Sequence, residues 1–300
     1  MIIKLRYFFK MTVKEFMKTA KRALAIHDIS GFGKCSLTVA LPIISACGVE
    51  TTVMPTAVLS THTGGFTGYT HRDLTSDMRP MADHWKSLDL KFDAIYSGYL
   101  GSFEQIEIVK SIVSDFKTEN NFFLCDPAMA DHGKMYALFD MEFAKKMAEL
   151  CSLADIIVPN FTEAAFMTGE KYKEGPYTKE YVERIIKKLS DLGPKKIVLT
   201  GVYFDDKQLG CACCDTAAGE IEYCLRDRLT GVYHGTGDVF ASTLCGALLN
   251  DMSLKAATQT AAKFTCGCIE RTLKITPDVR YGVAFEGELP KLIKELTKDE

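Results

Sequence analysis

Short apolar runs alternate with amphipathic segments along most of the chain. The runs are residues 23–26, 52–59, 94–96, 122–125, 156–158 and 197–199. Between them, apolar residues recur every three or four positions, for example at Ile106, Val109, Ile112 and Val113 and again over residues 181–192. Nearly continuous apolar runs predict buried strands, and the three- to four-residue spacing predicts helices. The pattern therefore predicts an α/β fold, with a mostly parallel central sheet and helices on both faces.

The C-terminal third departs from simple alternation. Runs at 209–214 and 221–225 are separated by a turn at 216–219, which predicts a hairpin. Long helices are expected from about Gly237 and from about Ser253. No repeat, low-complexity stretch or linker interrupts residues 23–300, so we expect a single domain there. Residues 1–22 lack a core-forming pattern and are expected to form a disordered or amphipathic extension, with Met11 or Met17 as an alternative start.

Composition removes several classes of function. The formal net charge of −3 gives no reason to expect a surface for nucleic acid. No uncharged segment is long enough to span a membrane. The 11 cysteines lack the paired spacing of a structural zinc site, and we expect them to be reduced, buried thiols of a cytoplasmic protein.

Polar or glycine-containing clusters follow almost every predicted strand. Ligands bind outside the carboxyl ends of the strands in open α/β sheets, so these clusters predict one shared site. Each cluster taken alone is also ordinary turn chemistry. The clusters are 27–31, 60–64, 97–99, 126–127, 159–160 and 200–201.

The sharpest motif is Gly235-Thr236-Gly237-Asp238, which leads directly into an apolar helix. Glycines allow an anion to approach the backbone N–H groups, and a helix N-terminus adds partial positive charge. These properties predict an anion hole for a transferring phosphoryl group, with Asp238 as the base that accepts a hydroxyl proton. The alternative is that Asp238 only caps the helix.

This motif resembles that of the ribokinase-like kinases, in which the aspartate is the catalytic base. Residues 155–164, Asp-Ile-Ile-Val-Pro-Asn-Phe-Thr-Glu-Ala, are similar to the second motif of that superfamily, and residues 126–131 resemble the D-P-x-x-x-D segment of its vitamin-kinase branch. The resemblance covers about residues 24–273 and implies a ribokinase-like fold that uses ATP and Mg²⁺. The implied ATP-binding residues are Asn160, Glu163, Thr200, Gly235, Thr236 and Gly237, and the implied metal ligands are Asp126, Asp131 and Glu163.

Two further segments resemble the pyridoxal (vitamin B6) kinases within this superfamily. They are Ser60-Thr-His-Thr-Gly64 and Ser97-Gly98-Tyr99. The resemblance implies a homodimer that phosphorylates the 5′-hydroxymethyl group of pyridoxal, pyridoxine or pyridoxamine. The implied substrate-binding residues are Asp28, His62, Thr63, Tyr99 and Asp238.

Several alternatives stay open. The chain departs from animal-type members of the branch at His27-Asp28, where Asp28 either contacts the substrate or only caps a turn. It departs again at Val158, which offers only a carbonyl to a monovalent cation (K⁺ or Na⁺). A hydroxymethylpyrimidine kinase, a small-alcohol or nucleoside kinase, and a catalytically silent vitamin-binding regulator are the competing functions. A lid is expected to exclude water from the site, and residues 209–230 are the candidate segment.

Overall fold

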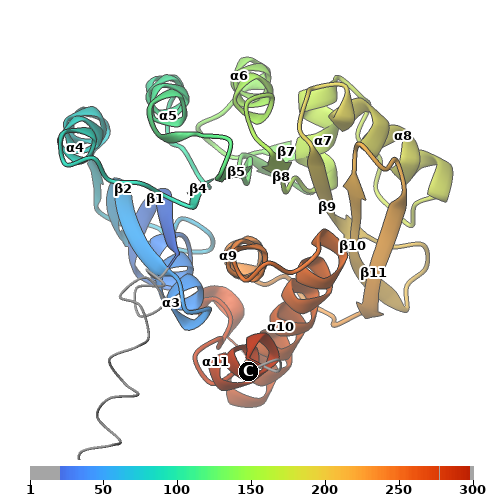
Figure 1. Cartoon of the computed structure of the whole chain (residues 1–300). Coiled ribbons are helices and arrows are strands. Elements are labelled where there is room, and N and C mark those ends of the chain that lie inside the picture. Colours follow the sequence, from blue (N-terminus) through green and yellow to red (C-terminus); the bar gives the residue numbers. More distant parts are fainter. Residues whose placement is uncertain (1–20, 277, 298–300) are drawn as a thin grey trace, which may run out of the picture.

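The computed structural model describes residues 21–276 and 278–297. Nine strands form one sheet in the order β11-β10-β9-β8-β5-β4-β1-β2-β3 (Figure 1). Strands β9, β8, β5, β4, β1 and β2 are mutually parallel, and antiparallel strands flank them on both sides. The strands are β1 (Arg22–Phe32), β2 (Glu50–Thr61), β3 (His71–Asp73), β4 (Ala94–Ser97), β5 (Phe122–Cys125), β8 (Ile156–Ile157), β9 (Lys196–Val202), β10 (Gln208–Asp215) and β11 (Ile221–Asp227).

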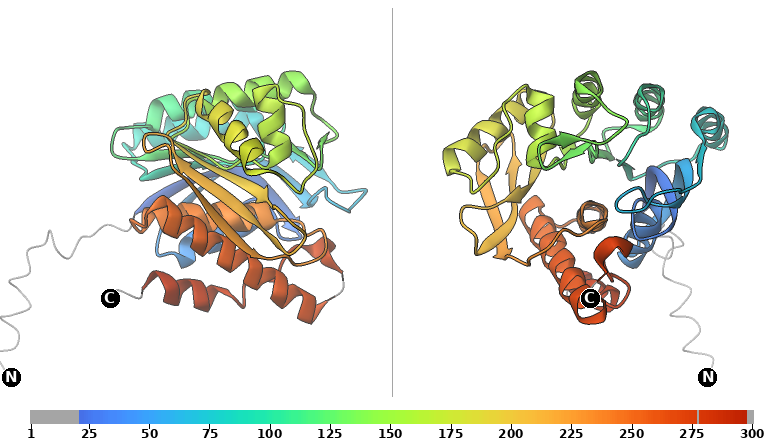
Figure 2. Two further views of the ribbon diagram at one scale, coloured as in Figure 1. Left: turned by 90° about the vertical axis from the view of Figure 1, so that its right-hand side faces the viewer. Right: turned by 180° about the vertical axis from the view of Figure 1, so that it is seen from behind.

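Helices cover both faces of the sheet, as the sequence predicts (Figures 1 and 2). One layer contains α4 (Thr75–Ser87), α5 (Phe103–Phe116), α6 (Met141–Cys151), α7 (Phe161–Thr168) and α8 (Lys179–Ser190). The other contains α3 (Leu37–Ala46), α9 (Thr236–Leu249), α10 (Leu254–Ile275) and α11 (Leu289–Leu296). A 3₁₀ turn, Val279–Tyr281, and a separate small hairpin, β6 (Ala130–Asp131) and β7 (Lys134–Met135), complete these elements.

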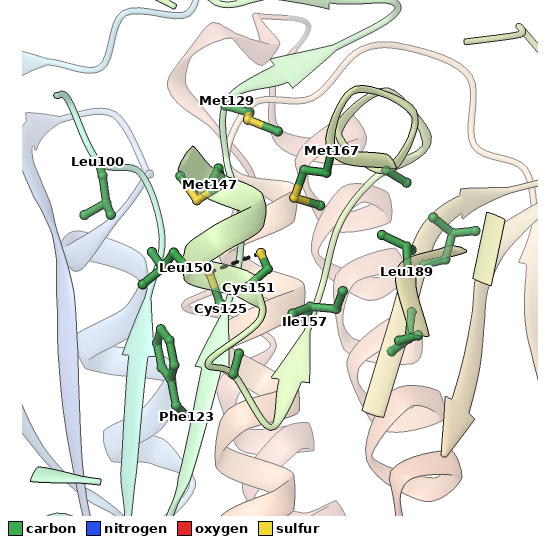
Figure 3. Packing of buried hydrophobic residues seen from close by; sticks show 14 of the residues in the cluster. Leu100, Phe123, Cys125, Met129, Met147, Leu150, Cys151, Ile157, Met167 and Leu189 are labelled. Carbon is green, nitrogen blue, oxygen red and sulfur yellow. Dashed lines mark hydrogen bonds between the residues drawn. The ribbon is translucent and has the colours of Figure 1, made fainter. Parts of the chain in front are cut away.

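Two hydrophobic cores lie between the sheet and its helix layers. Figure 3 shows part of the first core, where Phe123 and Ile157 of the sheet lie near Met147 and Leu150 of α6. All 11 cysteines are free thiols, and nine of them are buried. Free thiols in these positions fill the cores as small apolar side chains, which agrees with the expectation from the sequence.

The structure corrects some boundaries. The cluster at 27–31 is not a turn but lies inside β1, because β1 keeps pairing with β2 as far as Phe32 and Thr61. The predicted hairpin forms, and because β10 pairs with β9 it extends the sheet rather than standing over it as a lid.

At the N-terminal side, β1 begins at Arg22, which the sequence had assigned to the extension. The rest of the predicted extension, up to residue 20, lies outside the described residues. Within residues 21–276 and 278–297, no helix is both long enough and apolar enough to cross a membrane.

Candidate active site

Four carboxylates from distant parts of the chain gather near the carboxyl ends of the parallel strands. Asp28 lies in β1, Asp126 follows β5, Glu163 lies in the first turn of α7 and Asp238 lies in the first turn of α9. Their charges interact from one neighbour to the next. The charge of Asp28 raises the pKa of Asp238, that of Asp238 raises the pKa of Asp126, and that of Asp126 raises the pKa of Glu163. The single edge site predicted from the strand-end clusters is therefore present.

The N-terminus of α9 is built to receive an anion. Gly235 is the N-cap residue in a left-handed conformation, with φ of 74°, and a Cβ there would collide with the carbonyl oxygen of Lys34. Among the described residues, no side chain caps this helix. The amides of Thr236 and Gly237 therefore start a helix whose first N–H groups carry partial positive charge and have no side-chain cap in the part of the chain that the structure describes, with the carboxylate of Asp238 in the same turn. The Thr236 hydroxyl points back to the Tyr233 carbonyl, 3.2 Å away.

Asp238 makes no cap hydrogen bond to its own helix within the described residues. It is the third residue of α9, and its Oδ2 accepts a hydrogen bond of 2.9 Å from the N–H of Ser36. The pKa of Asp238 is raised to about 7, mainly by burial; the hydrogen bond from the Ser36 N–H lowers it and the charge of Asp28 raises it. A carboxylate that titrates near neutrality suits general base chemistry.

Asp28 lies beside this base and is itself held by two hydroxyls. Ser36 donates to its Oδ1 at 2.6 Å and Ser30 to its Oδ2 at 3.1 Å. Burial raises the pKa of Asp28, and the two serine hydroxyls oppose that increase. Tyr99 lies close enough to feel the charge of Asp28. Burial, and then this charge, raise the pKa of the Tyr99 hydroxyl to about 12. The Tyr99 ring packs against Phe139 at 5.5 Å between centroids.

Asp126 and Glu163 are buried without a protein cation. Burial is the main cause that raises the pKa of each well above its ordinary value, and repulsion from Asp238 and Asp126 respectively adds to it. Among the described residues, no lysine, arginine or histidine forms an ion pair with either. Buried carboxylates normally need a proton, a cation or a metal ion. This donor set therefore suits a hard cation such as Mg²⁺.

The residues predicted to bind ATP also have a structural role in the fold. Asn160 caps α7, because its Oδ1 accepts hydrogen bonds from the N–H groups of Thr162 and Glu163 at 2.8 and 3.0 Å. In return, the Glu163 carboxylate accepts a hydrogen bond from the Asn160 N–H. The Glu163 carboxylate also accepts from the Met129 N–H. Thr200 lies next to Asn160 across a parallel bridge. A role for Asn160, Glu163 and Thr200 towards ATP stays a prediction.

The remaining predicted residues are less central. Asp131 in β6 is about half exposed and faces His132, with 3.6 Å between their charged atoms. Thr63 is exposed. His62 is buried and its ring already has two partners, the Gly64 N–H on Nδ1 and the Arg280 carbonyl on Nε2. A substrate contact by His62 stays a prediction and requires it to exchange one of these partners.

Sequence reasoning missed Ser36, and it named Ser30 and His27 without a role, as members of the cluster at 27–31. Ser36 and Ser30 hold Asp28, and His27 precedes it in β1. His27 is fully buried, neither ring nitrogen has a hydrogen-bond partner among the described residues, and burial lowers its pKa to about 3. The pattern around Ser36 is that of an ordinary helix N-cap, so only its backbone dihedrals and contacts distinguish it.

An uncapped helix N-terminus together with a set of buried carboxylates is an arrangement suited to phosphoryl transfer. Comparison with known proteins agrees. Residues 40–281 match the family model described as phosphomethylpyrimidine kinase. A Bacteroides thetaiotaomicron protein described as a phosphomethylpyrimidine kinase, crystallised in one form with pyridoxal, is 36% identical in that form with a TM-score of 0.87, over 91% of this chain and 96% of its own.

Two pyridoxal kinases are also similar. That of Lactobacillus plantarum is 31% identical with a TM-score of 0.85, over 93% of this chain and 99% of its own. That of Homo sapiens is 29% identical over 252 residues, which are 76% of this chain and 77% of its own. The chain therefore belongs to the phosphomethylpyrimidine kinase family, within the ribokinase-like superfamily, and has the pyridoxal kinase fold.

Proposed function

We propose that the chain is a pyridoxal kinase, which transfers the γ-phosphoryl group of ATP to the 5′-hydroxymethyl group of pyridoxal, pyridoxine or pyridoxamine. The observation that carries this proposal is Asp238, a carboxylate with its pKa raised to about 7 by burial, directly behind the uncapped N-terminus of α9. The pyridoxal-bound relative at 36% identity supports the vitamer as the acceptor.

In this mechanism, Asp238 accepts the hydroxyl proton as the alcohol oxygen attacks phosphorus. The N–H groups of residues 235–237 stabilise the negative charge that spreads over the transferring phosphoryl oxygens. Asp28, whose charge acts on Asp238, and Tyr99, whose hydroxyl lies near Asp28, bind and orient the aromatic ring. The carboxyl proton leaves Asp238 after product release, which restores the base.

Mg²⁺ completes the proposed site. When bound with ATP, the ion would supply positive charge that offsets the charge of the phosphates. Asp126 and Glu163 are the proposed buried ligands of the metal, directly or through water. Asp131, which is about half exposed, is the third proposed ligand. In the described residues, no three acidic, histidine or cysteine side chains are grouped closely enough to hold a metal without the nucleotide. This arrangement fits a metal that arrives with ATP.

The test is a coupled assay of ADP release with pyridoxal, pyridoxine, pyridoxamine, hydroxymethylpyrimidine and ribose as acceptors. The proposal expects the vitamers to be the best acceptors by kcat/KM. It fails if none of them supports ADP release above the rate without acceptor.

A hydroxymethylpyrimidine kinase is the second candidate. The family model and the description of the Bacteroides protein favour it. The same Asp238 and α9 geometry serves both substrates, because each offers a primary alcohol on an aromatic ring. A higher kcat/KM for hydroxymethylpyrimidine than for every vitamer would establish this second function.

Three further expectations belong to the proposal. A homodimer is expected, and light scattering on the purified chain tests it. A K⁺ or Na⁺ site next to Val158 is expected to use only backbone oxygens there, because the Val158 side chain is apolar and buried. A cytoplasmic location is expected, and fractionation of the source cells tests it.

A further inference from the structure

Ser36 has an unusual backbone conformation for its residue type. It lies at the N-cap of α3 with φ of 56° and ψ of −131°. Glycine enters the positive-φ region freely, whereas a Cβ makes it unfavourable. A side chain at such a position is expected to contribute something that glycine could not.

The contribution is not helix capping. The Ser36 side chain makes no cap hydrogen bond to α3. Its hydroxyl instead donates to Asp28 at 2.6 Å, and its backbone N–H donates to Asp238 at 2.9 Å. One residue therefore bridges a carboxylate in β1 and a carboxylate in α9, which are 210 positions apart in the sequence.

Contacts of the neighbouring Lys34 hold this bridge against Gly235, where α9 begins. The Lys34 N–H donates to the Tyr281 carbonyl at 3.0 Å. On its other side, the Lys34 carbonyl packs so closely on Gly235 that any Cβ there would collide with it. The segment 34–36 is consequently held between the 3₁₀ turn at Tyr281 and the start of α9.

We infer that Ser36 is a positioning residue for the transfer, which sets the distance and orientation of the base Asp238 relative to the substrate-binding Asp28. This inference rests on the proposed function and deepens it. Misplacing reacting groups by about 1 Å costs on the order of 100-fold in rate. A bridge that fixes both carboxylates therefore affects kcat more than it affects binding.

Ser36→Gly is the principal variant, because it removes the hydroxyl and tolerates φ of 56° without strain. Ser36→Ala removes the same hydroxyl and keeps the unfavourable Cβ. Ser30→Ala removes the other hydroxyl on Asp28 without touching Asp238. Thr38→Ala is the matched control, because the Thr38 hydroxyl bonds only to the carbonyls of Gly33 and Cys35 in the same loop.

With pyridoxal as acceptor, Ser36→Gly is expected to lower kcat by roughly 10- to 100-fold while the KM for ATP changes less than about twofold. Ser36→Ala should lose at least as much, since its loop must relax away from Asp238. Ser30→Ala should mainly raise the KM for pyridoxal, and Thr38→Ala should match the wild type. A folded Ser36→Gly enzyme with wild-type kcat, or an equal loss in Thr38→Ala, would overturn the inference.

Combining Ser36→Gly with Asp238→Asn separates this inference from the proposed function. If Ser36 acts through Asp238, Ser36→Gly adds little to the larger loss that Asp238→Asn causes alone. Independent, multiplicative losses would overturn the positioning role. Failure of the proposed function is recognised differently, by a wild-type chain that does not phosphorylate any vitamer or by Asp238→Asn that keeps full activity.

Discussion

Helices α7 and α9 both begin at the carboxyl edge of the sheet, and their N-termini differ in one respect. α7 satisfies its own first turn, because Asn160 and Glu163 form a capping box with reciprocal bonds. α9 begins at Gly235 with no side-chain cap among the described residues, and its acidic residue accepts from Ser36 instead. One terminus is closed by its own residues, and the other is left for a ligand.

The difference shows that an acidic residue in the first turn of a helix has two distinct uses. The Glu163 carboxylate accepts hydrogen bonds from two backbone N–H groups, those of Asn160 and Met129. In Asp238 one oxygen stays available to an incoming hydroxyl. Stability is therefore expected to depend on the α7 terminus, and turnover on the α9 terminus.

The largest expected effect is at Asp238. Asp238→Asn keeps an oxygen that can accept from the Ser36 N–H but cannot take a proton, so kcat for pyridoxal should fall by roughly 10²- to 10⁴-fold. Steady-state ADP release measures the loss. Thermal unfolding and pyridoxal binding by calorimetry should remain near wild type. A variant that turns over at the wild-type rate would remove Asp238 as the base.

The pH profile should show the same base. Because burial raises the pKa of Asp238 to about 7, the reactive carboxylate is lost as pH falls through that value. We expect kcat/KM to decrease about tenfold per pH unit well below pH 7. Asp28→Asn removes the nearby charge that helps to raise this pKa, so its acidic limb should move to lower pH. An acidic limb that Asp28→Asn leaves in place would assign the titration to another group.

A change at the N-terminus of α7 should alter the stability of the fold. Asn160→Ala removes the cap and should lower the free energy of unfolding by about 1 kcal/mol, within a range of about 0.5–2. Urea denaturation measures the difference. Asn160→Asp is the control: it keeps the cap, because Asp caps about as well as Asn, and loses only the hydrogen bond of 2.8 Å that Asn160 Nδ2 donates to the Ala130 carbonyl. If Asn160→Ala is as stable as the wild type, the capping box is not what holds α7 in place.

The smallest expected effect is at Glu163. Glu163→Gln keeps one oxygen that can accept from the Asn160 N–H, gives up the second acceptor, which the Met129 N–H uses, and removes the charge proposed to help hold Mg²⁺. The Mg²⁺ concentration for half-maximal rate should rise severalfold, while the affinity for pyridoxal without nucleotide stays constant. Titration of the rate with Mg²⁺ at fixed ATP measures it. An unchanged magnesium dependence would leave Glu163 with its capping role alone.

Local pattern was sufficient for much of the molecule. The apolar runs at 122–125 and 94–96 predicted β5 and β4 because buried parallel strands are apolar on both faces. The run at 23–26 predicted only part of β1. Its continuation contains Asp28 and Ser30, whose polarity is typical of turns, yet pairing with β2 keeps them in a strand.

By itself the sequence determined the α/β class, the two helix layers, the glycine-rich start of α9 and Asp238 as the candidate base, because each depends on residues close together in the chain. Only the tertiary structure decided which carboxylates share a site, that both nitrogens of His62 already have partners, and that Ser36 bridges Asp28 and Asp238. Those facts depend on contacts between segments up to 218 positions apart. Periodicity and local motifs carry no information about such contacts, because the contacts arise only when the strands are ordered in one sheet.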